Sequence, residues 1–208
     1  MSQVRTRQVK KPEVRKAEIV RVALGMFVEQ GFERTTVDGI TGRLGVAKGC
    51  FYHHFRSKND VFDACVVELA DRLLAEYLAI LTDPALGPRR RLVAYLDHNY
   101  AAAAAPAAEG FLRDLHSGDF GAIHRRVTDA VEAALRPVFV RVVEEGVAAG
   151  EFEVADPEFA AVAVLGALTA LHAAHAGRPG LDLVEHREQV LDLLARMLNT
   201  PDAGMAER

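Results

Sequence analysis

The 208-residue chain is half hydrophobic, contains two cysteines and has a formal net charge of −4. This length allows one small domain and one medium-sized domain with its own core, and the two cysteines are interpreted as free thiols. No uninterrupted apolar run approaches the ~18–20 residues of a membrane span, and residues 5–16 lack the apolar core of a signal peptide, so we expect a cytoplasmic protein without a membrane partner.

The charge is divided unevenly along the chain. Residues 1–60 hold 12 Lys and Arg against 6 Asp and Glu, a net charge of +6, whereas the other 148 residues hold 13 against 23, a net charge of −10. A basic end on an acidic body is typical of a protein that presents that end to a polyanion. Residues 1–11 precede any apolar periodicity, and we interpret them as a flexible basic arm, which either contacts DNA or is simply a solvated terminus.

Residues 31–58 are predicted to form a helix-turn-helix. Apolar residues three and four apart give the first of its two helices an inward face: Val37, Ile40 and Leu44. Thr35 and Thr36 lie where the N-cap of this helix is expected. Gly45 can adopt a positive φ, so it breaks the pattern and allows a second short helix over residues 47–55 to leave at a steep angle.

The second helix of this motif has a surface suited to the DNA major groove. Phe51 and Phe55 point to the core, which leaves these residues outward, the last of them at the edge: Lys48, Gly49, Cys50, Tyr52, His53 and His54. Lys48 supplies positive charge, Gly49 permits close approach to a groove wall, and Tyr52 carries a hydroxyl for a phosphate. Base discrimination would come from Lys48, Cys50 and His53, and Lys58 would hold a flanking phosphate. The alternative is an ordinary α-hairpin with solvated lysine and histidine side chains.

Residues 13–63 resemble the DNA-binding domain of the tetracycline-repressor (TetR) family of bacterial transcription regulators. The resemblance runs through a first helix with Ile19, Ala23, Met26 and Phe27, the Gly31-Phe32 stop, the threonine pair, Gly45-Val46, Lys48-Gly49, residues 51–55 and Ser57-Lys58. It implies a dimeric, all-helical repressor with a three-helix DNA-binding domain over residues 12–58. It also implies that these positions contact DNA: Thr36, Lys48, Gly49, Cys50, Tyr52, His53, His54 and Lys58.

Three residues depart from the family pattern. Ala47 stands where a capping serine is common, and the missing hydroxyl costs the short helix ~0.5–2 kcal/mol. Gly39 and Gly42 stand where stronger helix formers are usual, each at a cost of roughly 1 kcal/mol relative to alanine. We therefore expect the first helix of the motif to be marginal on its own.

Residues 59–199 are predicted to be helical, because proline and glycine interrupt helical periodicity and no strand alternation is present. Helices are expected over 61–81, 89–105, 107–116, 121–148, 157 to the turn at 177–180, and 183–198. We expect residues 200–208 to form a disordered tail. The predicted fold class is all-α, with a larger C-terminal helical domain for ligand binding and dimerisation behind the DNA-binding domain.

The last two helices have faces suited to a homodimer. Small residues recur three and four apart on the penultimate helix: Ala160, Ala163, Gly166, Ala167, Ala170, Ala173 and Ala174. The final helix has an apolar face: Val190, Leu191, Leu194, Met197 and Leu198. Two copies of this helix pair could form a four-helix interface, or both faces could pack within one chain. The resemblance favours the dimer, whose two heads would read major grooves about 34–36 Å apart.

The resemblance also implies a small-molecule cavity among the central helices. Candidate lining residues are Tyr95, Asn99, Tyr100, Phe111, His116, Phe120, Phe139 and His172, although each also fits a plain core or surface position. Aromatic and aliphatic walls favour a largely apolar effector. His172 and His175 lie three apart, but no acidic or thiol ligand joins them at metal-binding spacing, so we predict neither a metal nor a cofactor.

An enzyme is the competing class. The serines Ser2, Ser57 and Ser117 do not lie in G-x-S-x-G, and nucleotide-binding glycine motifs are absent from the sequence. We therefore expect a non-enzymatic repressor that binds a palindromic operator in double-stranded DNA as a dimer and is released by a small ligand. The alternative is a sequence-tolerant DNA-binding protein with no ligand switch.

Overall fold

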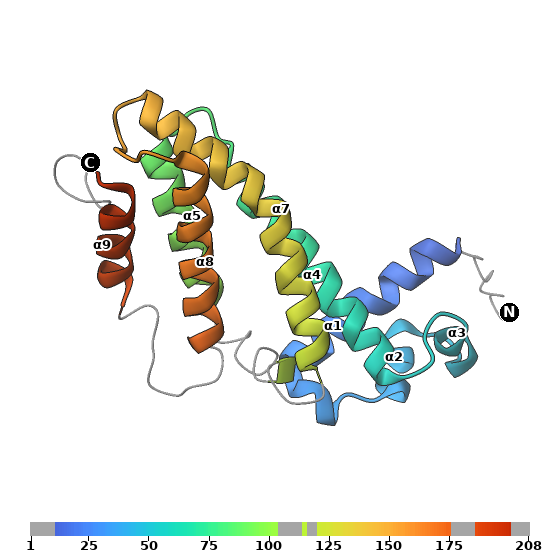
Figure 1. Cartoon of the computed structure of the whole chain (residues 1–208). Coiled ribbons are helices and arrows are strands. Elements are labelled where there is room, and N and C mark those ends of the chain that lie inside the picture. Colours follow the sequence, from blue (N-terminus) through green and yellow to red (C-terminus); the bar gives the residue numbers. More distant parts are fainter. Residues whose placement is uncertain (1–10, 104–113, 116–119, 176–185, 201–208) are drawn as a thin grey trace, which may run out of the picture. The chain divides into compact units, whose positions relative to one another are not determined.

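The computed structural model describes residues 11–103, 114–115, 120–175 and 186–200. They form helices α1 (Pro12–Arg34), α2 (Val37–Leu44), α3 (Lys48–Tyr52), α4 (Lys58–Leu81), α5 (Pro88–Ala103), α7 (Gly121–Ala148), α8 (Pro157–His175) and α9 (Arg187–Leu198) (Figure 1). No β-strand occurs among these residues, which confirms the all-helical prediction. Most of the basic arm, the tail after Thr200 and most of the helix expected over 107–116 fall outside the described residues.

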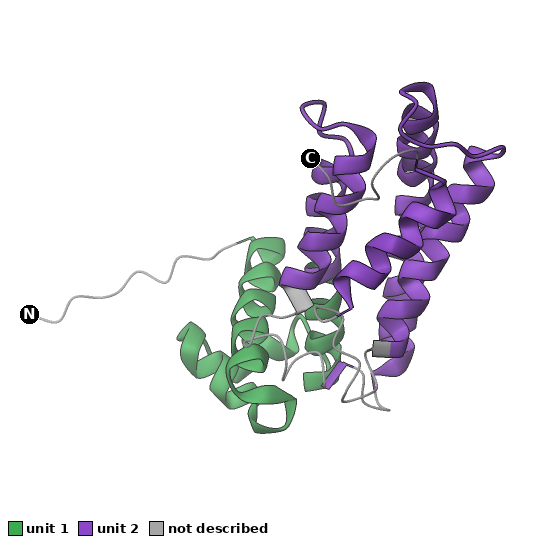
Figure 2. Cartoon of the chain, turned by 90° about the vertical axis from the view of Figure 1, so that its left-hand side faces the viewer, with its two compact units in different colours: residues 1–68 green, residues 69–208 purple. Residues whose placement is uncertain are grey.

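The chain divides into two compact units, residues 1–68 and residues 69–208 (Figure 2). Three phenylalanine rings hold the first unit together: Phe27 lies 5.6 Å from Phe32 and 5.1 Å from Phe62, and Phe32 lies 5.2 Å from Phe62 between centroids. The surrounding core consists of residues with no exposed surface: Ile19, Ala23, Ile40, Phe51, Val61 and Cys65. The first unit is thus built from α1 to α3 and the start of α4.

Gly31 and Gly45 both have positive φ, and they mark the two expected interruptions in this unit. Gly31 (φ 81°, ψ 166°) interrupts α1, as the Gly31-Phe32 stop predicts. Gly45 (φ 67°, ψ 34°) ends α2 in the left-handed conformation, which a side chain with a Cβ adopts only at a cost. Thr35 lies outside α2; it is buried and its hydroxyl donates to the Gly31 carbonyl at 2.8 Å.

The two glycines within α2 differ in their surroundings. A Cβ at Gly39 would lie 2.9 Å from Cε of Met26, the flexible end of that side chain, and 3.2 Å from Oγ1 of Thr36, so an added side chain there would require Met26 to shift. A Cβ at Gly42 would meet nothing within 4 Å. Only Gly42 therefore weakens the helix without a packing reason.

The second unit is a helical bundle in which α7 packs against α5 and α8, and α8 also packs against α9 (Figure 1). Its largest fully buried side chains include Leu81, Leu92, Leu135, Phe139, Phe152 and Leu194. The core also takes up Val190, Leu191 and Leu198 of α9, and Ala160 of α8. The α9 face that we expected at a dimer interface therefore packs within the chain, because the periodicity of an apolar face does not specify its partner.

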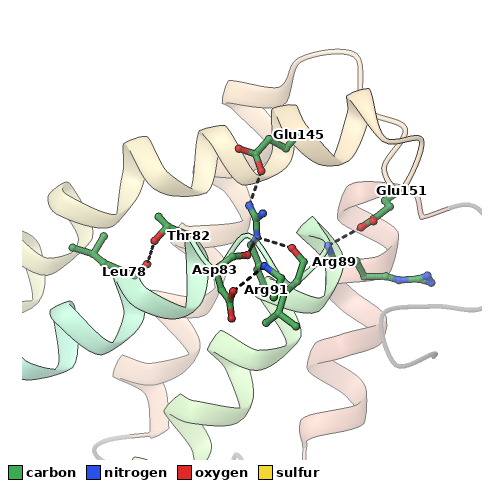
Figure 3. Close-up of polar contacts among 9 residues, drawn as sticks. Leu78, Thr82, Asp83, Arg89, Arg91, Glu145 and Glu151 are labelled. Carbon is green, nitrogen blue, oxygen red and sulfur yellow. Dashed lines mark hydrogen bonds and ion pairs between the residues drawn. The ribbon is translucent and has the colours of Figure 1, made fainter.

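The turn between α4 and α5 is fastened to the rest of the second unit by Arg91 (Figure 3). Its Nε donates to the carbonyl of Asp83 at 2.8 Å and to that of Leu86 at 2.9 Å, and its Nη1 forms an ion pair with Glu145 of α7. Glu151 accepts the Arg89 backbone N–H at 2.8 Å, near the start of α5. The end of α4 is thus connected to both α5 and α7.

Within the described residues, one stretch of α8 has the length and mean hydropathy of a membrane span. Residues Pro157–Ala174 form an 18-residue stretch of mean hydropathy 1.4, which by length and composition alone could cross a membrane, and 22% of it is buried in the structure. Glu158, Thr169 and His172 interrupt this stretch, so it is not an uninterrupted apolar run and the expectation stated from the sequence still holds. The helix begins at Pro157, as predicted, and Asp156 caps it by accepting the Phe159 N–H at 3.0 Å.

Candidate functional site

The helix-turn-helix begins with a capped helix. Thr36 is the N-cap of α2, and its Oγ1 accepts the Gly39 N–H at 3.0 Å. The cap residue of α3 is Ala47, which provides no side-chain hydrogen bond, as the sequence predicts. The α3 helix is also shorter than expected, ending at Tyr52 instead of Phe55, although Phe51 and Phe55 are both buried.

The outward surface of α3 carries most of the predicted DNA-contacting side chains. Lys48, Gly49, Tyr52 and His53 are exposed, while Cys50 and His54 are half-buried. Tyr52 is 51% exposed, and its ring rests edge-on against Phe51 at 5.5 Å. The hydroxyl is therefore presented by a ring that the core supports.

Lys48 has an intramolecular partner that the sequence did not reveal. Its Nζ lies 2.9 Å from Oδ1 and 3.1 Å from Oδ2 of Asp38 in the first turn of α2. This hydrogen bond, with the attraction of the carboxylate, raises the pKa of Lys48. The contact joins the two helices of the motif across their exposed side.

Lys58 contacts the end of α1. Its Nζ donates to the Phe32 carbonyl at 2.8 Å and lies 3.9 Å from the centroid of the Phe32 ring. The carbonyl lies just past the Gly31 break, so the ammonium satisfies a backbone acceptor there. Any phosphate contact by Lys58 would add to this structural role.

His54 lies beside Lys16 and Arg15 at the edge of α3. Burial lowers its pKa first, electrostatic interactions with His53, Lys16 and Arg15 lower it further, and Glu13 opposes them. This direction favours the neutral imidazole, which can accept as well as donate a hydrogen bond. Its ring contacts that of His53 edge-on at 5.0 Å.

The two cysteines are free and lie in different environments. Cys65 is fully buried, and burial raises the pKa of its thiol to about 12. It is therefore an unreactive core residue. Cys50 is half-buried on α3.

Several residues proposed for an effector site lie in the second unit. Tyr95 and Phe139 are buried and meet edge-on at 5.2 Å, and Tyr95 also meets Tyr77 at 4.9 Å. The Tyr77 hydroxyl donates to Oδ1 of Asn99 at 2.8 Å. These contacts bring three of the predicted residues together with Tyr77, which the sequence argument missed although it lies on the apolar face of α4.

The other proposed effector residues are more dispersed. Tyr100 and Phe120 are buried, whereas His172 is exposed on α8, with its ring stacked 6.3 Å from that of His124. Phe111 and His116 lie outside the described residues, as does the side chain of His175. Among the side chains that are described, no three of His, Cys, Asp or Glu gather as a metal site.

An ion pair that the sequence argument also missed ties α5 to α9. Arg187 donates from Nε to Oδ1 of Asp97 at 2.6 Å and from Nη2 to Oδ2 at 3.0 Å. The residues are 90 positions apart, so no local spacing signals the contact. This two-pronged bond fixes the start of α9 on α5.

Two family models match the chain. Residues 19–65 match the model described as "Bacterial regulatory proteins, tetR family". Residues 86–179 match the model described as "Tetracyclin repressor-like, C-terminal domain". The first match contains α2 and α3, and the second contains α5 and α7.

Individual proteins show the same similarity. Over 149 residues the chain is 30% identical to the HTH-type transcriptional repressor KstR2 of Mycolicibacterium smegmatis, covering 68% of this chain and 69% of that protein. A TetR/AcrR-family regulator from Thermobifida fusca is 29% identical, with a TM-score of 0.61 over 89% of this chain and 97% of that one. SmeT, the repressor of the Stenotrophomonas maltophilia multidrug efflux pump SmeDEF, is 22% identical, with a TM-score of 0.65 over 94% and 93%. SmeT has also been solved in complex with triclosan.

Proposed function

Because the chain belongs to the tetR family of bacterial regulatory proteins, we propose that it binds a palindromic operator as a dimer and is released by a small, largely apolar ligand. Membership makes it a DNA-binding transcription regulator, a class that is distinct from enzymes. The relatives that are named repressors favour repression. Since its relatives are bacterial transcription regulators, we place the protein in the cytoplasm.

The exposed face of α3 is the observation that carries this proposal. Lys48, Tyr52 and His53 point away from a core that contains Phe51. A Cβ at Gly49 would meet nothing within 4 Å, so packing inside the protein does not require glycine there. Close approach to a groove wall would require it. We assign the DNA contacts to Thr36, Lys48, Gly49, Cys50, Tyr52, His53, His54 and Lys58.

The dimer proposal is supported by the outer face of α8. Large apolar side chains are exposed there, Phe159 by 73% and Val162 by 40%, and the small residues Gly166 and Ala170 continue the exposed face. Exposed apolar surface of this extent on an otherwise apolar helix favours burial against a partner. Leu193 of α9 is also 39% exposed. We therefore keep the last two helices as the interface, with α8 as its main part.

Replacing Val162 with glutamate should convert the dimer to a monomer, because the substitution places a charge on the exposed apolar face of α8 that the proposed interface would bury. Val67 on α4 is the matched control, since it is a valine with the same 40% exposure in the N-terminal unit. Light scattering at micromolar concentration should give a dimer for the wild type and for Val67→Glu, and a monomer for Val162→Glu. A monomeric wild type would refute the dimer, and a dimeric Val162→Glu would refute this interface.

The effector proposal rests on the aromatic residues of the second unit. Tyr95 and Phe139 are buried together, and burial raises the pKa of Tyr95, so its hydroxyl stays neutral. Such surroundings favour an apolar ligand that accepts a few hydrogen bonds. The triclosan complex of SmeT, whose fold is similar, supports small-molecule binding in this fold. We propose Tyr95, Asn99, Tyr100, Phe111, His116, Phe120, Phe139 and His172 as contributors.

The switch would act through α4, which begins in the first unit and ends in the second. The turn that follows α4 is held by Arg91 to α5 and α7. A ligand that favours one arrangement of these helices would change the spacing of the two heads in the dimer. Two heads spaced for successive major grooves would then no longer fit their half-sites.

Selection of bound duplexes from a random library tests the proposed function. The wild-type protein should enrich one palindrome whose half-site centres are one helical turn apart or a multiple of it, about 34–36 Å per turn. Members of one class of apolar compounds should then release that duplex. Binding with a steep salt dependence but without an enriched palindrome would instead support the sequence-tolerant alternative.

A further inference from the structure

The pairing of Asp38 with Lys48 has a consequence for DNA recognition. Both carboxylate oxygens lie within 3.1 Å of Nζ, and the side chains are 72% and 52% exposed. The ion pair therefore lies on the outer surface of the helix-turn-helix and forms no part of its core. Asp38 is in the first turn of α2, where the positive end of the helix favours a carboxylate.

We propose that Asp38 is a specificity-determining residue, which withholds Lys48 from DNA phosphates in general and leaves it available for a base edge in the operator. The inference rests on the proposed function, because it takes the α2–α3 surface to be the one that meets DNA. The expected effect of Asp38 is on the affinity of the protein for DNA that lacks the operator.

The net charge of the Asp38–Lys48 pair determines how the pair interacts with DNA phosphates. A lysine that neutralises a phosphate releases about 0.9 counterion from B-DNA, which appears as salt dependence of the affinity. Lys48 and Asp38 together carry no net charge, so the pair neutralises no phosphate charge. On random DNA, Lys48 would have to leave Asp38 for a phosphate, and the carboxylate would then lie beside that phosphate.

The Lys48 ammonium has more hydrogen-bond donors than the contact with Asp38 needs. A lysine ammonium has three donors, so Lys48 can keep one bond to Asp38 and give another to an acceptor on a base, such as O6 or N7 of guanine. At the operator the ion pair can therefore persist, and binding does not require Asp38 to be displaced. Asp38 thus weakens non-specific binding more than operator binding, which raises the ratio between them.

Lys58, the other lysine of the motif, is held by different contacts, which explains why Asp38 affects Lys48. Lys58 donates to the Phe32 carbonyl and covers the Phe32 ring, so its position is fixed by the core of the head. Within the described part of the chain, Lys48 is anchored through the exposed carboxylate of Asp38. Removing that carboxylate leaves a mobile cation on α3 and alters no buried contact.

Titration of the full-length protein with a random-sequence duplex and with the selected operator, from about 50 to 200 mM salt, tests the proposal. Asp38→Asn should steepen the salt dependence for random DNA by an exponent of ~0.9, which is roughly 3.5-fold in affinity over this fourfold range. Operator affinity should change less, so the specificity ratio should fall. The double variant Asp38→Asn/Lys48→Ala should return the slope for random DNA to that of the wild type.

Glu33→Gln is the control, because it removes the same charge from an exposed position in the same unit. Equal slopes for Asp38→Asn and Glu33→Gln would overturn the proposal, as would an unchanged specificity ratio in Asp38→Asn. If the wild type binds DNA and only these comparisons fail, the proposed function stands and this inference alone is wrong. If neither the wild type nor any variant binds either duplex, both are wrong. Thermal unfolding confirms that every variant is folded at the assay temperature.

Discussion

Tyr52→Ala is expected to weaken binding to operator and to random DNA by similar factors, while the protein remains folded. A hydrogen bond from the hydroxyl to a charged phosphate is worth about 1.5–3 kcal/mol, so the loss at each head should be at least roughly tenfold in affinity. The ring is 51% exposed, and its only described ring contact is with Phe51. Truncating it therefore removes little buried surface.

Tyr52→Phe separates the hydroxyl from the ring in this test. If the hydroxyl holds a phosphate, the phenylalanine variant should bind DNA as weakly as the alanine variant, and neither should change the preferred sequence. Binding is measured by fluorescence anisotropy at a fixed salt concentration. Wild-type affinity in Tyr52→Phe would show that the hydroxyl makes no such contact, and the assignment of Tyr52 as a phosphate anchor would then be wrong.

The helices of the first unit could be predicted because the sequence features that define them are local. Thr36 caps α2, Gly45 adopts a positive φ, and Phe51 and Phe55 are buried. Each follows from the conformational preference or spacing of residues within a few positions. The same local logic accounts for the start of α8, which Asp156 caps.

The partners of the charged side chains were not predictable in this way. Lys58 and the Phe32 carbonyl are 26 residues apart, and Asp38 and Lys48 are 10 apart on different helices. Lys58 looked like a simple phosphate anchor, but the structure also gives it a role in holding the end of α1. A substitution of Lys58 would therefore change both the stability of the fold and the affinity for DNA. A substitution of Tyr52 tests the DNA affinity with less effect on stability.

In the second unit, apolar periodicity did not identify which surface covers a helix face. The apolar face of α9 has the spacing expected of an interface, yet Leu191 and Leu194 pack within their own chain. Apolar spacing reports that a face is buried, and the identity of the covering surface depends on the tertiary fold. The structure was needed to show which face of α8 is buried in the core and which face is exposed.

Gly146→Ala is expected to destabilise the second unit, although alanine is the better helix former. Of the two glycines near the end of α7, only Gly150 has a positive φ, at 71°. Gly146 lies inside α7, where a Cβ would be 2.0 Å from Cδ2 and 2.2 Å from Cε2 of Phe152. That ring is 1% exposed and cannot move into solvent. Overpacking of this kind costs about 1–3 kcal/mol or more, measured by chemical unfolding.

The Phe152→Ala background identifies steric overlap as the cause. Removing the ring alone should cost about 3–5 kcal/mol, since it leaves a cavity in the core. In that background the Cβ added at position 146 no longer meets a ring, so Gly146→Ala should become neutral or stabilising by up to ~1 kcal/mol through helix propensity. A change of sign would show that glycine is present to admit Phe152. An equal loss in both backgrounds would contradict this packing, because the penalty would then not depend on the ring.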